Sequence, residues 1–178
     1  MDRFTVLIGR ESFDTKLRSV GSVRIAYMDF LSDIALIHAC ADALVKILSP
    51  ISTAIVVPET GAIPLGFALA TKLNRPLVVL RKGHRGYMGP SLSVPVKSVA
   101  AERDESLFLE EVYLPTLRLG PVTLIDTVTS SGGTLRSMQA LMSVAGVEVA
   151  ETAVAFTEGE DVPSDVLAVG KLPVFAAE

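Results

Sequence analysis

Residues 122–134 read Val-Thr-Leu-Ile-Asp-Thr-Val-Thr-Ser-Ser-Gly-Gly-Thr, and this stretch decides the fold that the sequence predicts. It begins with an apolar run typical of a buried strand, which we expect to end at Asp126. Small hydroxyl and glycine residues fill positions 130–134. From Leu135 onward, apolar side chains recur at helical spacing. The stretch therefore predicts a strand, a tight turn and a helix.

The turn has the composition of a phosphate-binding loop. Glycine lets the backbone approach a ligand closely, and the free N–H groups and dipole of a helix start favour an anion. The candidate loop residues are Thr129, Ser130, Ser131, Gly132, Gly133 and Thr134. Asp126 is unsuited to a phosphate, but it could accept hydrogen bonds from sugar hydroxyls or hold a divalent cation. A turn that only caps the helix is the plainer alternative.

Residues 122–134 resemble the phosphoribosyl pyrophosphate (PRPP) fingerprint of the type I phosphoribosyltransferases. That pattern has four mostly apolar residues, two acids and a Thr-Gly-Gly-Thr-like end. Asp126 matches the first acid, Thr127 stands in place of the second, and Ser131 stands for the first threonine. The resemblance implies that the loop binds the 5′-phosphate of PRPP and that Asp126 holds the ribose hydroxyls. It also implies an α/β fold with a parallel central sheet flanked by helices, a small hood and a flexible hairpin.

The composition suits a single globular domain over residues 1–178, with 49% hydrophobic and 20% charged residues. The net charge of −4 leaves no basic excess for a nucleic-acid partner. Charges interrupt every apolar stretch before the ~18 residues that a membrane span needs. The mean hydropathy of +0.48 is high for a chain of this size, which suggests surface buried between subunits, as in a homodimer, although a thermophilic origin or a large core would also account for it.

The single cysteine, Cys40, lies in an apolar helical pattern, so we expect it to pack in the core rather than act as a nucleophile. One cysteine cannot form a disulfide within the chain, which favours a reducing cytoplasm. Two histidines and one cysteine, far apart in sequence, do not predict a zinc site. Neither a Walker A loop nor a Gly-x-Gly-x-x-Gly motif occurs, which argues against a common nucleotide hydrolase or a dinucleotide site.

The remaining pattern alternates strands and helices, which favours a parallel sheet. Strands are expected at 5–9, 22–28, 54–57, 77–80, 147–156 and 172–175, and helices at 34–48, 65–73 and 135–145. Ser32 is the expected N-cap of the first helix. Residues 157–170 read as a polar, turn-like segment. Residues 1–32 are expected to contribute the hood.

A second strand-end loop, Val-Pro-Glu-Thr-Gly-Ala-Ile-Pro-Leu-Gly at 57–66, makes Glu59, Thr60 and Gly61 candidate site residues. Ligands of open α/β sheets bind beyond the carboxyl ends of the strands. An ordinary Pro/Gly turn is the alternative. The resemblance implies that this is the pyrophosphate loop, which often has a non-proline cis peptide. Gly61-Ala62 stands where adenine phosphoribosyltransferases usually have Arg-Gly, and is closer to some orotate and archaeal purine relatives.

Two cations, Arg81 and Lys82, end the strand at 77–80 and suit a polyanionic ligand. Elsewhere such a pair would be two solvated surface charges. Here it resembles the Arg-Lys pair of adenine and xanthine phosphoribosyltransferases, which implies pyrophosphate binding by Arg81 and Lys82. His84 and Arg85 are weaker candidates of the same kind.

Residues 83–119 are expected to form a flexible excursion with hairpin arms at 93–99 and 107–113. Such a cover could exclude water during sugar transfer and then open for product release. An exposed hairpin without a role is the alternative. Glu102 and Glu105, near its tip, are candidates for acid or base chemistry, and Glu102 joins Asp126 and Lys82 as an expected catalytic residue.

The resemblance implies an enzyme that transfers the phosphoribosyl group of PRPP to a purine base, with adenine favoured and AMP and pyrophosphate as products. Mg²⁺ is the expected cofactor, carried by PRPP, with Asp126 the one protein side chain expected to touch it. Tyr27 and Phe30 are the base-binding candidates by position. The alternatives are a hypoxanthine/guanine phosphoribosyltransferase and a non-catalytic PRPP-sensing regulator, for which the loss of the second acid at Thr127 would be typical.

Overall fold

A five-stranded parallel sheet forms the centre of the computed structural model, which describes residues 3–96 and 105–176. The strands lie in the order β10-β9-β8-β4-β5, and every neighbouring pair is parallel. They are β4 (Ala54–Pro58), β5 (Leu77–Leu80), β8 (Val122–Thr129), β9 (Val149–Glu158) and β10 (Val166–Leu172). The predicted α/β fold with a parallel central sheet is confirmed.

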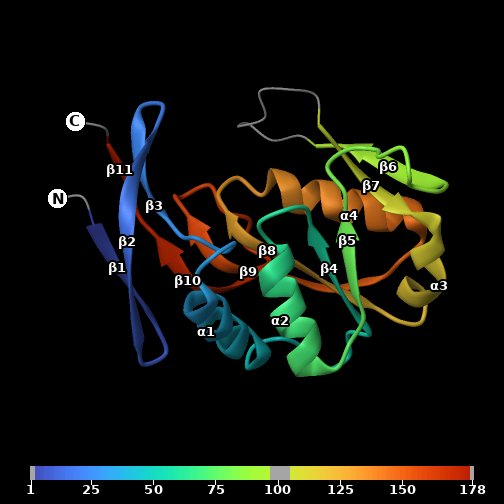
Figure 1. Cartoon of the computed structure of the whole chain (residues 1–178), viewed down its shortest axis with the longest axis horizontal. Helices are drawn as coiled ribbons and strands as arrows, with labels where there is room; N and C mark the ends of the chain where they lie inside the picture. Colours follow the sequence, from blue (N-terminus) through green and yellow to red (C-terminus); the bar gives the residue numbers. More distant parts are fainter. Residues whose placement is uncertain (1–2, 97–104, 177–178) are drawn as a thin grey trace.

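Helices cover both faces of this sheet (Figure 1). One face packs against α1 (Ile34–Val45) and α2 (Ile63–Leu73), and the other against α4 (Gly133–Ala145). Strand β4 shows the alternation that produces the two layers, because Ile55 and Val57 join the first core cluster and Ala54 and Val56 the second. A strand that is buried on both faces has to be apolar throughout, as the sequence 54–57 is.

A separate antiparallel sheet stands at one end of the molecule, and we call it the hood because it contains the residues from which a hood is predicted (Figure 1). Its strands are β1 (Arg3–Ile8), β2 (Glu11–Val20), β3 (Val23–Tyr27) and β11 (Val174–Ala176). Strand β2 was not expected, because most of its side chains are exposed and only a partial alternation of Phe13, Thr15 and Leu17 faces inward. Strand β11 pairs with β3, so a distant segment completes a sheet that was expected from residues 1–32.

The predicted hairpin is present as β6 (Ser91–Pro95) and β7 (Ser106–Glu110), although its arms are shifted from the expected positions. Residues 111–113 form a 3-10 helix and α3 spans Leu114–Leu117, so the predicted second arm ends earlier than expected. Val94, Leu107 and Leu109 are buried against α4 rather than held in a free flap. The tip that contains Glu102 lies outside the described residues.

Several boundaries differ from the sequence prediction, and those nearest the predicted site are the following. Asp33 rather than Ser32 caps α1, because its Oδ1 accepts the N–H of Leu36 at 3.0 Å. Strand β8 continues past Asp126 to Thr129, and α4 begins at Gly133 rather than Leu135. The segment expected to be turn-like includes β10, an edge strand that is only half-buried and so lacks a strong apolar pattern.

Cys40 is fully buried in the first core cluster, as predicted. Burial, with the nearby Asp33 carboxylate, raises the pKa of the Cys40 thiol to about 12, so it stays protonated and inert. In the described part of the chain, no helix is both long and apolar enough to cross a membrane.

Candidate functional site

Three adjacent strands bring the predicted site segments to one edge of the sheet. Strand β8 lies beside β4, and β4 lies beside β5, all parallel. Their carboxyl ends therefore place the loop after β8 next to the loop at Glu59, and Glu59 next to Arg81. The sheet order thus gathers segments that are far apart in the sequence.

The loop after β8 ends in a helix start that no side chain caps. Gly132 is the N-cap of α4 with φ +75°, and none of the cap side-chain bonds that usually satisfy the first N–H groups is made. Gly132 is also confined, because an added Cβ would clash with the ring of Pro163. Ser131 and Thr134 are half-buried around it, Ser130 is exposed, and Thr129 is the buried last residue of β8. We call residues 130–134 the phosphate loop, because its open N–H groups suit an anion.

Arg136 is a residue of this loop region that the sequence analysis missed. Its Nη1 donates to the carbonyl of Ser131 at 2.6 Å, and the same atom would lie 3.1 Å from a Cβ at Gly132. A cation in the first turn of a helix opposes the helix dipole. That unfavourable placement, three residues after a glycine pair, is the signal that could have identified it, since a bound anion would offset the repulsion.

Asp126 lies within β8, half-buried, rather than at a strand end as predicted. Its burial raises the pKa of the carboxyl to about 6, while the Thr127 N–H and the charge of Lys82 act in the opposite direction. The Thr127 N–H donates to Asp126 Oδ1 at 2.7 Å. Asp126 is therefore ionised at neutral pH and changes charge within a unit or so of it.

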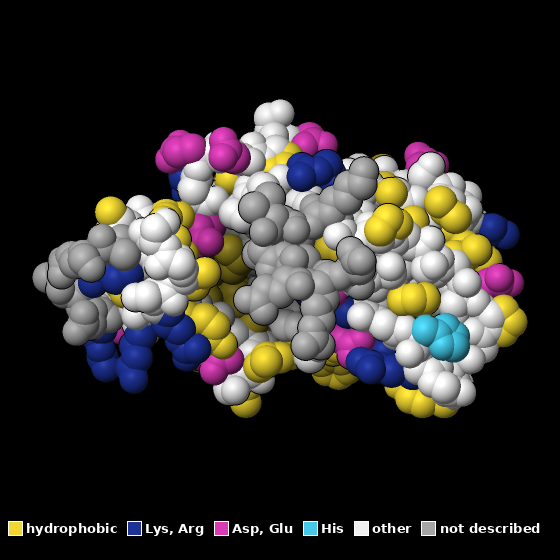
Figure 2. All heavy atoms as spheres, turned by 90° about the horizontal axis from the view of Figure 1, so that it is seen from above, with side chains coloured by type: hydrophobic (Ala, Val, Ile, Leu, Met, Phe, Trp, Pro, Cys, Tyr) yellow, Lys and Arg dark blue, Asp and Glu magenta, His cyan; other side chains and the backbone are white. Residues whose placement is uncertain are grey.

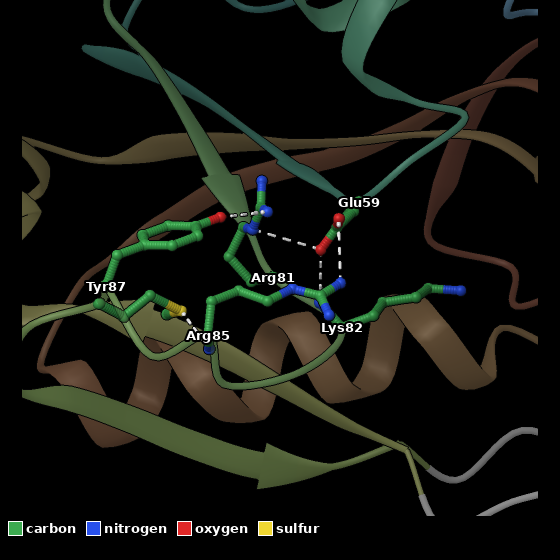
Figure 3. A network of polar contacts seen from close by, with 6 residues as sticks. Glu59, Arg81, Lys82, Arg85 and Tyr87 are labelled. Carbon is green, nitrogen blue, oxygen red and sulfur yellow. Dashed lines mark hydrogen bonds and ion pairs between the residues drawn. The ribbon is translucent and has the colours of Figure 1, made fainter.

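Three basic residues follow β5 and surround one carboxylate (Figure 3). We call Arg81, Lys82 and Arg85 the cation cluster. Glu59 Oε2 accepts the backbone N–H of Lys82 at 3.1 Å and lies 3.3 Å from Arg81 Nε, and Glu59 Oε1 lies 3.7 Å from Arg85 Nη2. The peptide bond between Glu59 and Thr60 is cis, as the resemblance implies. Glu59 therefore contacts the cations directly.

The side chain of Lys82 contacts one carboxylate and acts electrostatically on another. Its Nζ lies 3.7 Å from Oε2 of Glu105, the residue before β7, and its charge lowers the pKa of Asp126. Lys82 thus links the cation cluster to Asp126. Tyr87, a second residue that the sequence analysis missed, accepts a hydrogen bond on its hydroxyl from Arg81 Nη2 at 3.0 Å. No sequence pattern pointed to Tyr87, because it lies in an irregular glycine-rich loop.

The two base-binding candidates lie in different surroundings. Phe30 is 4% exposed and packs on the core ring of Phe156, with centroids 6.3 Å apart. Tyr27 is 37% exposed, and the guanidinium of Arg18 covers its ring at 3.6 Å. Lys and Arg side chains gather on the hood side of the molecule (Figure 2).

Tyr27 and Arg18 line a pocket of about 250 Å³ between the hood and the start of α1. Of the described residues that line this pocket, none belongs to the phosphate loop or the cation cluster. The structure therefore brings together the phosphate loop, Asp126, Glu59 and the cation cluster, but it does not join Tyr27 or Phe30 to them.

Within residues 3–96 and 105–176, no three His, Cys, Asp or Glu side chains gather as a metal site. A Mg²⁺ ion that arrives with a diphosphate needs few protein ligands, since phosphate and water oxygens supply most of its shell. Asp126 fits such an ion as a single hard oxygen donor on the same sheet edge as the cation cluster.

Comparison with known proteins agrees with this arrangement. Residues 32–174 match the phosphoribosyl transferase domain family. A hypoxanthine/guanine phosphoribosyltransferase of Methanothrix soehngenii is 33% identical over 105 residues, or 59% of this chain and 52% of that protein. The purine biosynthesis transcriptional repressor PurR of Bacillus subtilis is 32% identical over 95 residues, 51% of this chain and 33% of PurR. This chain thus spans about half the length of the first curated relatives that it matches.

Among solved structures, the adenine phosphoribosyltransferase of Thermoanaerobacter pseudethanolicus superposes with a TM-score of 0.69. The superposition covers 87% of this chain and 95% of that chain at 19% identity, which establishes a shared fold. The family match spans most of the chain and includes Glu59, the cation cluster and the phosphate loop. The chain therefore belongs to the type I phosphoribosyltransferase family.

Proposed function

We propose that this protein is a purine phosphoribosyltransferase, which transfers the phosphoribosyl group of PRPP to a purine base and releases pyrophosphate. The observation that carries the proposal is the adjacency of β8, β4 and β5. It places an uncapped helix start, suited to a 5′-phosphate, on the same sheet edge as a cation cluster suited to pyrophosphate. PRPP carries these two anionic groups on opposite sides of one ribose.

In this proposal each group stabilises charge at a fixed place. The phosphate loop holds the 5′-phosphate through its N–H groups, and Arg136 adds a positive charge at its mouth. Asp126 accepts hydrogen bonds from the ribose hydroxyls in its ionised form. Lys82 and Arg81 face the negative charge that grows on the departing pyrophosphate. Such preorganised groups often supply the largest part of catalysis.

Mg²⁺, carried by the pyrophosphate and touched by Asp126, would supply further neutralisation of the leaving group. Glu105 Oε2 forms an ion pair with Lys82 Nζ at 3.7 Å. The catalytic role of Glu102 stays a prediction. The homodimer and the cytoplasmic location also stay predictions.

The base is open between two candidates. The Arg81-Lys82 pair resembles that of adenine enzymes, and the adenine phosphoribosyltransferase structure reported above shares the fold of this chain at 19% identity. The Methanothrix relative, a hypoxanthine/guanine enzyme, is the closer in sequence of the two, at 33% identity. This similarity favours a 6-oxopurine at least as much as adenine, and Tyr27 and Phe30 stay predicted base contacts.

A PRPP-sensing regulator is the second candidate function, because Thr127 replaces the second acid of the fingerprint and a repressor is among the relatives. The single-acid site would then bind PRPP without turnover. Thr127 contributes its N–H to Asp126, which a sensor could use equally well.

A turnover assay separates these candidates. Purified protein is mixed with PRPP and Mg²⁺ and, in separate reactions, adenine, hypoxanthine, guanine, xanthine, uracil or orotate, and nucleotides are separated by chromatography. AMP as the only product supports the adenine enzyme, and IMP or GMP supports the 6-oxopurine enzyme. PRPP binding by calorimetry with no nucleotide from any base supports the regulator and refutes the enzyme.

A further inference from the structure

A single partly buried carboxylate contacts the side chains of Arg81 and Arg85 and the backbone N–H of Lys82 (Figure 3). The side chain of Glu59 is 14% exposed, whereas those of Arg81, Lys82 and Arg85 are 30%, 40% and 49% exposed. Its two oxygens have different partners: Oε2 accepts the Lys82 N–H and pairs with Arg81 Nε, and Oε1 pairs with Arg85 Nη2. Glu59 therefore lies behind the cations, on their protein side.

A carboxylate in this position is not a ligand for a diphosphate. Its negative charge would repel phosphate oxygens, Oε2 already accepts the Lys82 N–H, and both oxygens lie in ion pairs with arginines. What it does is fix where the cations stand. Long basic side chains lose considerable rotamer freedom when a ligand orders them, and a partner that orders them beforehand lowers that cost.

More contacts restrain Arg81 than Arg85. Arg81 is bound at Glu59 and at the Tyr87 hydroxyl, and its backbone N–H and C=O pair with Phe108. Arg85 is tied to Glu59 at 3.7 Å only through Oε1, and half of its side chain is exposed. Exposed ion pairs are weak and exchange readily. The Arg81 contact is itself an ion pair rather than an aligned hydrogen bond, because Nε is buried without a hydrogen-bond partner.

We propose that Glu59 is a positioning residue for diphosphate, which holds Arg81 in place and keeps Arg85 near the site until the diphosphate oxygens take Arg85 over. The inference rests on the proposed function, since it assigns the anion at this cluster as the pyrophosphate group. Glu59 touches no substrate atom, and acts through the two arginines and the Lys82 backbone.

Three substitutions of Glu59 distinguish the effect of the length of its side chain from the effect of its charge. Glu59→Gln keeps the length of the side chain and one acceptor oxygen but loses the charge. Glu59→Asp keeps the charge but withdraws the oxygens from the arginines, and Glu59→Ala loses both. The probe is inorganic pyrophosphate with Mg²⁺, titrated by calorimetry, and ribose 5-phosphate is titrated into the same proteins as a probe of the phosphate loop.

If Glu59 is a positioning residue, Glu59→Asp and Glu59→Ala should weaken pyrophosphate binding by about tenfold and Glu59→Gln by about threefold, the range expected for one charge-assisted hydrogen bond and two partly exposed ion pairs. Ribose 5-phosphate affinity should stay within about twofold in all three, since the phosphate loop lies on another strand end. A general loss of structure would weaken both ligands together.

Glu151→Gln is the matched control. Glu151 is also a partly buried glutamate that accepts a backbone N–H, from Ser49, but it lies near the start of β9, away from the carboxyl ends of the strands. The Glu151→Gln protein should bind pyrophosphate with the same affinity as the parent protein.

Arg85→Ala tests the same contact from the cation side, and its exposed side chain can be removed without disturbing the core. It should weaken pyrophosphate binding by about tenfold alone, but by less in the Glu59→Ala background, where Arg85 is already released. Full additivity of the two losses would contradict the proposal.

The proposal fails if Glu59→Asp or Glu59→Ala binds pyrophosphate as tightly as the parent protein, or more tightly. That result would leave the proposed function standing. If the parent protein itself binds neither pyrophosphate nor PRPP, both the proposed function and the role of Glu59 are wrong.

Discussion

The phosphate loop and the cation cluster are both suited to anions, yet they are built from different parts of the chain. The phosphate loop uses backbone N–H groups at a helix start, fixed by one left-handed glycine. The cation cluster uses long side chains that contact the carboxylate of Glu59, a residue more than twenty positions away in the sequence. A backbone site depends on a local run of residues, whereas a side-chain site depends on which strands become neighbours.

The largest loss of affinity is expected from a substitution in the phosphate loop, which binds through backbone N–H groups. In Gly132→Asn the new Cβ would meet the Pro163 ring, and the loop has to move. We expect the affinity for ribose 5-phosphate and PRPP to fall on the order of a hundredfold, because several N–H contacts are lost together. Calorimetry with both ligands checks this.

Gly146→Asn is its control, because Gly146 also has a left-handed conformation (φ +64°) but has nearly open space at its Cβ, with only Arg118 at 3.8 Å. Both variants should lose some stability, since both replace a glycine at a positive φ. Only the Gly132 variant should lose the ligand, and equal affinities in the two would refute the phosphate-loop assignment.

Asp126→Asn tests the residue that we place at the ribose, between the phosphate loop and the cation cluster. We expect kcat/KM for PRPP to fall roughly a hundredfold, because an amide accepts ribose hydrogen bonds without the stabilising charge. The folded-state pKa of about 6 exceeds the usual Asp value, so ionisation of Asp126 costs stability as the pH rises from about 4 through 6.

Removing that charge should therefore raise the stability at pH 7.5 by on the order of 1 kcal/mol. A thermal melt of the two proteins measures it. Unchanged turnover in Asp126→Asn would remove its assigned role, and an unchanged or lower Tm would show that the carboxylate is better solvated than its position in β8 indicates.

A smaller effect is expected on the acid limb of the pH profile. Activity should decline as the pH falls through about 6, where Asp126 becomes protonated. The charge of Lys82 favours the ionised carboxylate, so Lys82→Met should move this titration to higher pH. A ¹³C NMR titration of the Asp126 carboxyl measures the shift even where turnover is low.

Lys171→Met is the corresponding control, because Lys171 forms an exposed ion pair with Glu160 and does not act on Asp126. A titration of Asp126 that stays at the same pH in Lys82→Met would mean that the two side chains do not interact, and would separate the cation cluster from the ribose site.

The smallest effect is expected from Glu105→Gln. Its contact with Lys82 spans 3.7 Å and both side chains are about 40% exposed, so the pair is worth less than about 1 kcal/mol. Both kcat and KM should stay within about twofold. A hundredfold loss of kcat with unchanged KM would instead give Glu105 a chemical role in the transfer.

The fold was largely predictable because its main elements have strong local patterns. The apolar runs at 54–57, 77–80 and 122–125 had to be strands buried on both faces, and the helices between them required a parallel sheet. Strands β2 and β10 were missed because each is partly exposed and its apolar alternation is weak. The sequence predicts that strand β8 ends at Asp126, because an acid is unusual inside a buried strand, but a half-buried acid can continue a strand when a backbone N–H binds it.

The candidate site, like the fold, has a part that the sequence predicts and a part that it does not. The phosphate loop could be recognised because thirteen consecutive residues carry it. The environment of Glu59 could not, since its three cationic partners meet it only after β4 and β5 pair. Tyr27 and Phe30 are three positions apart, and no sequence pattern showed that one would lie in the core and the other under Arg18.

The pairing of β11 with β3 has a consequence for the order in which the protein forms during synthesis. Strands β1 to β3 can pair with one another as soon as they leave the ribosome, because they are joined by tight turns. Their sheet lacks its fourth strand until residues 174–176 are made, after the whole parallel core. Strands β1 to β3 are therefore translated before the parallel core, and the sheet that they begin is completed only after that core has been made.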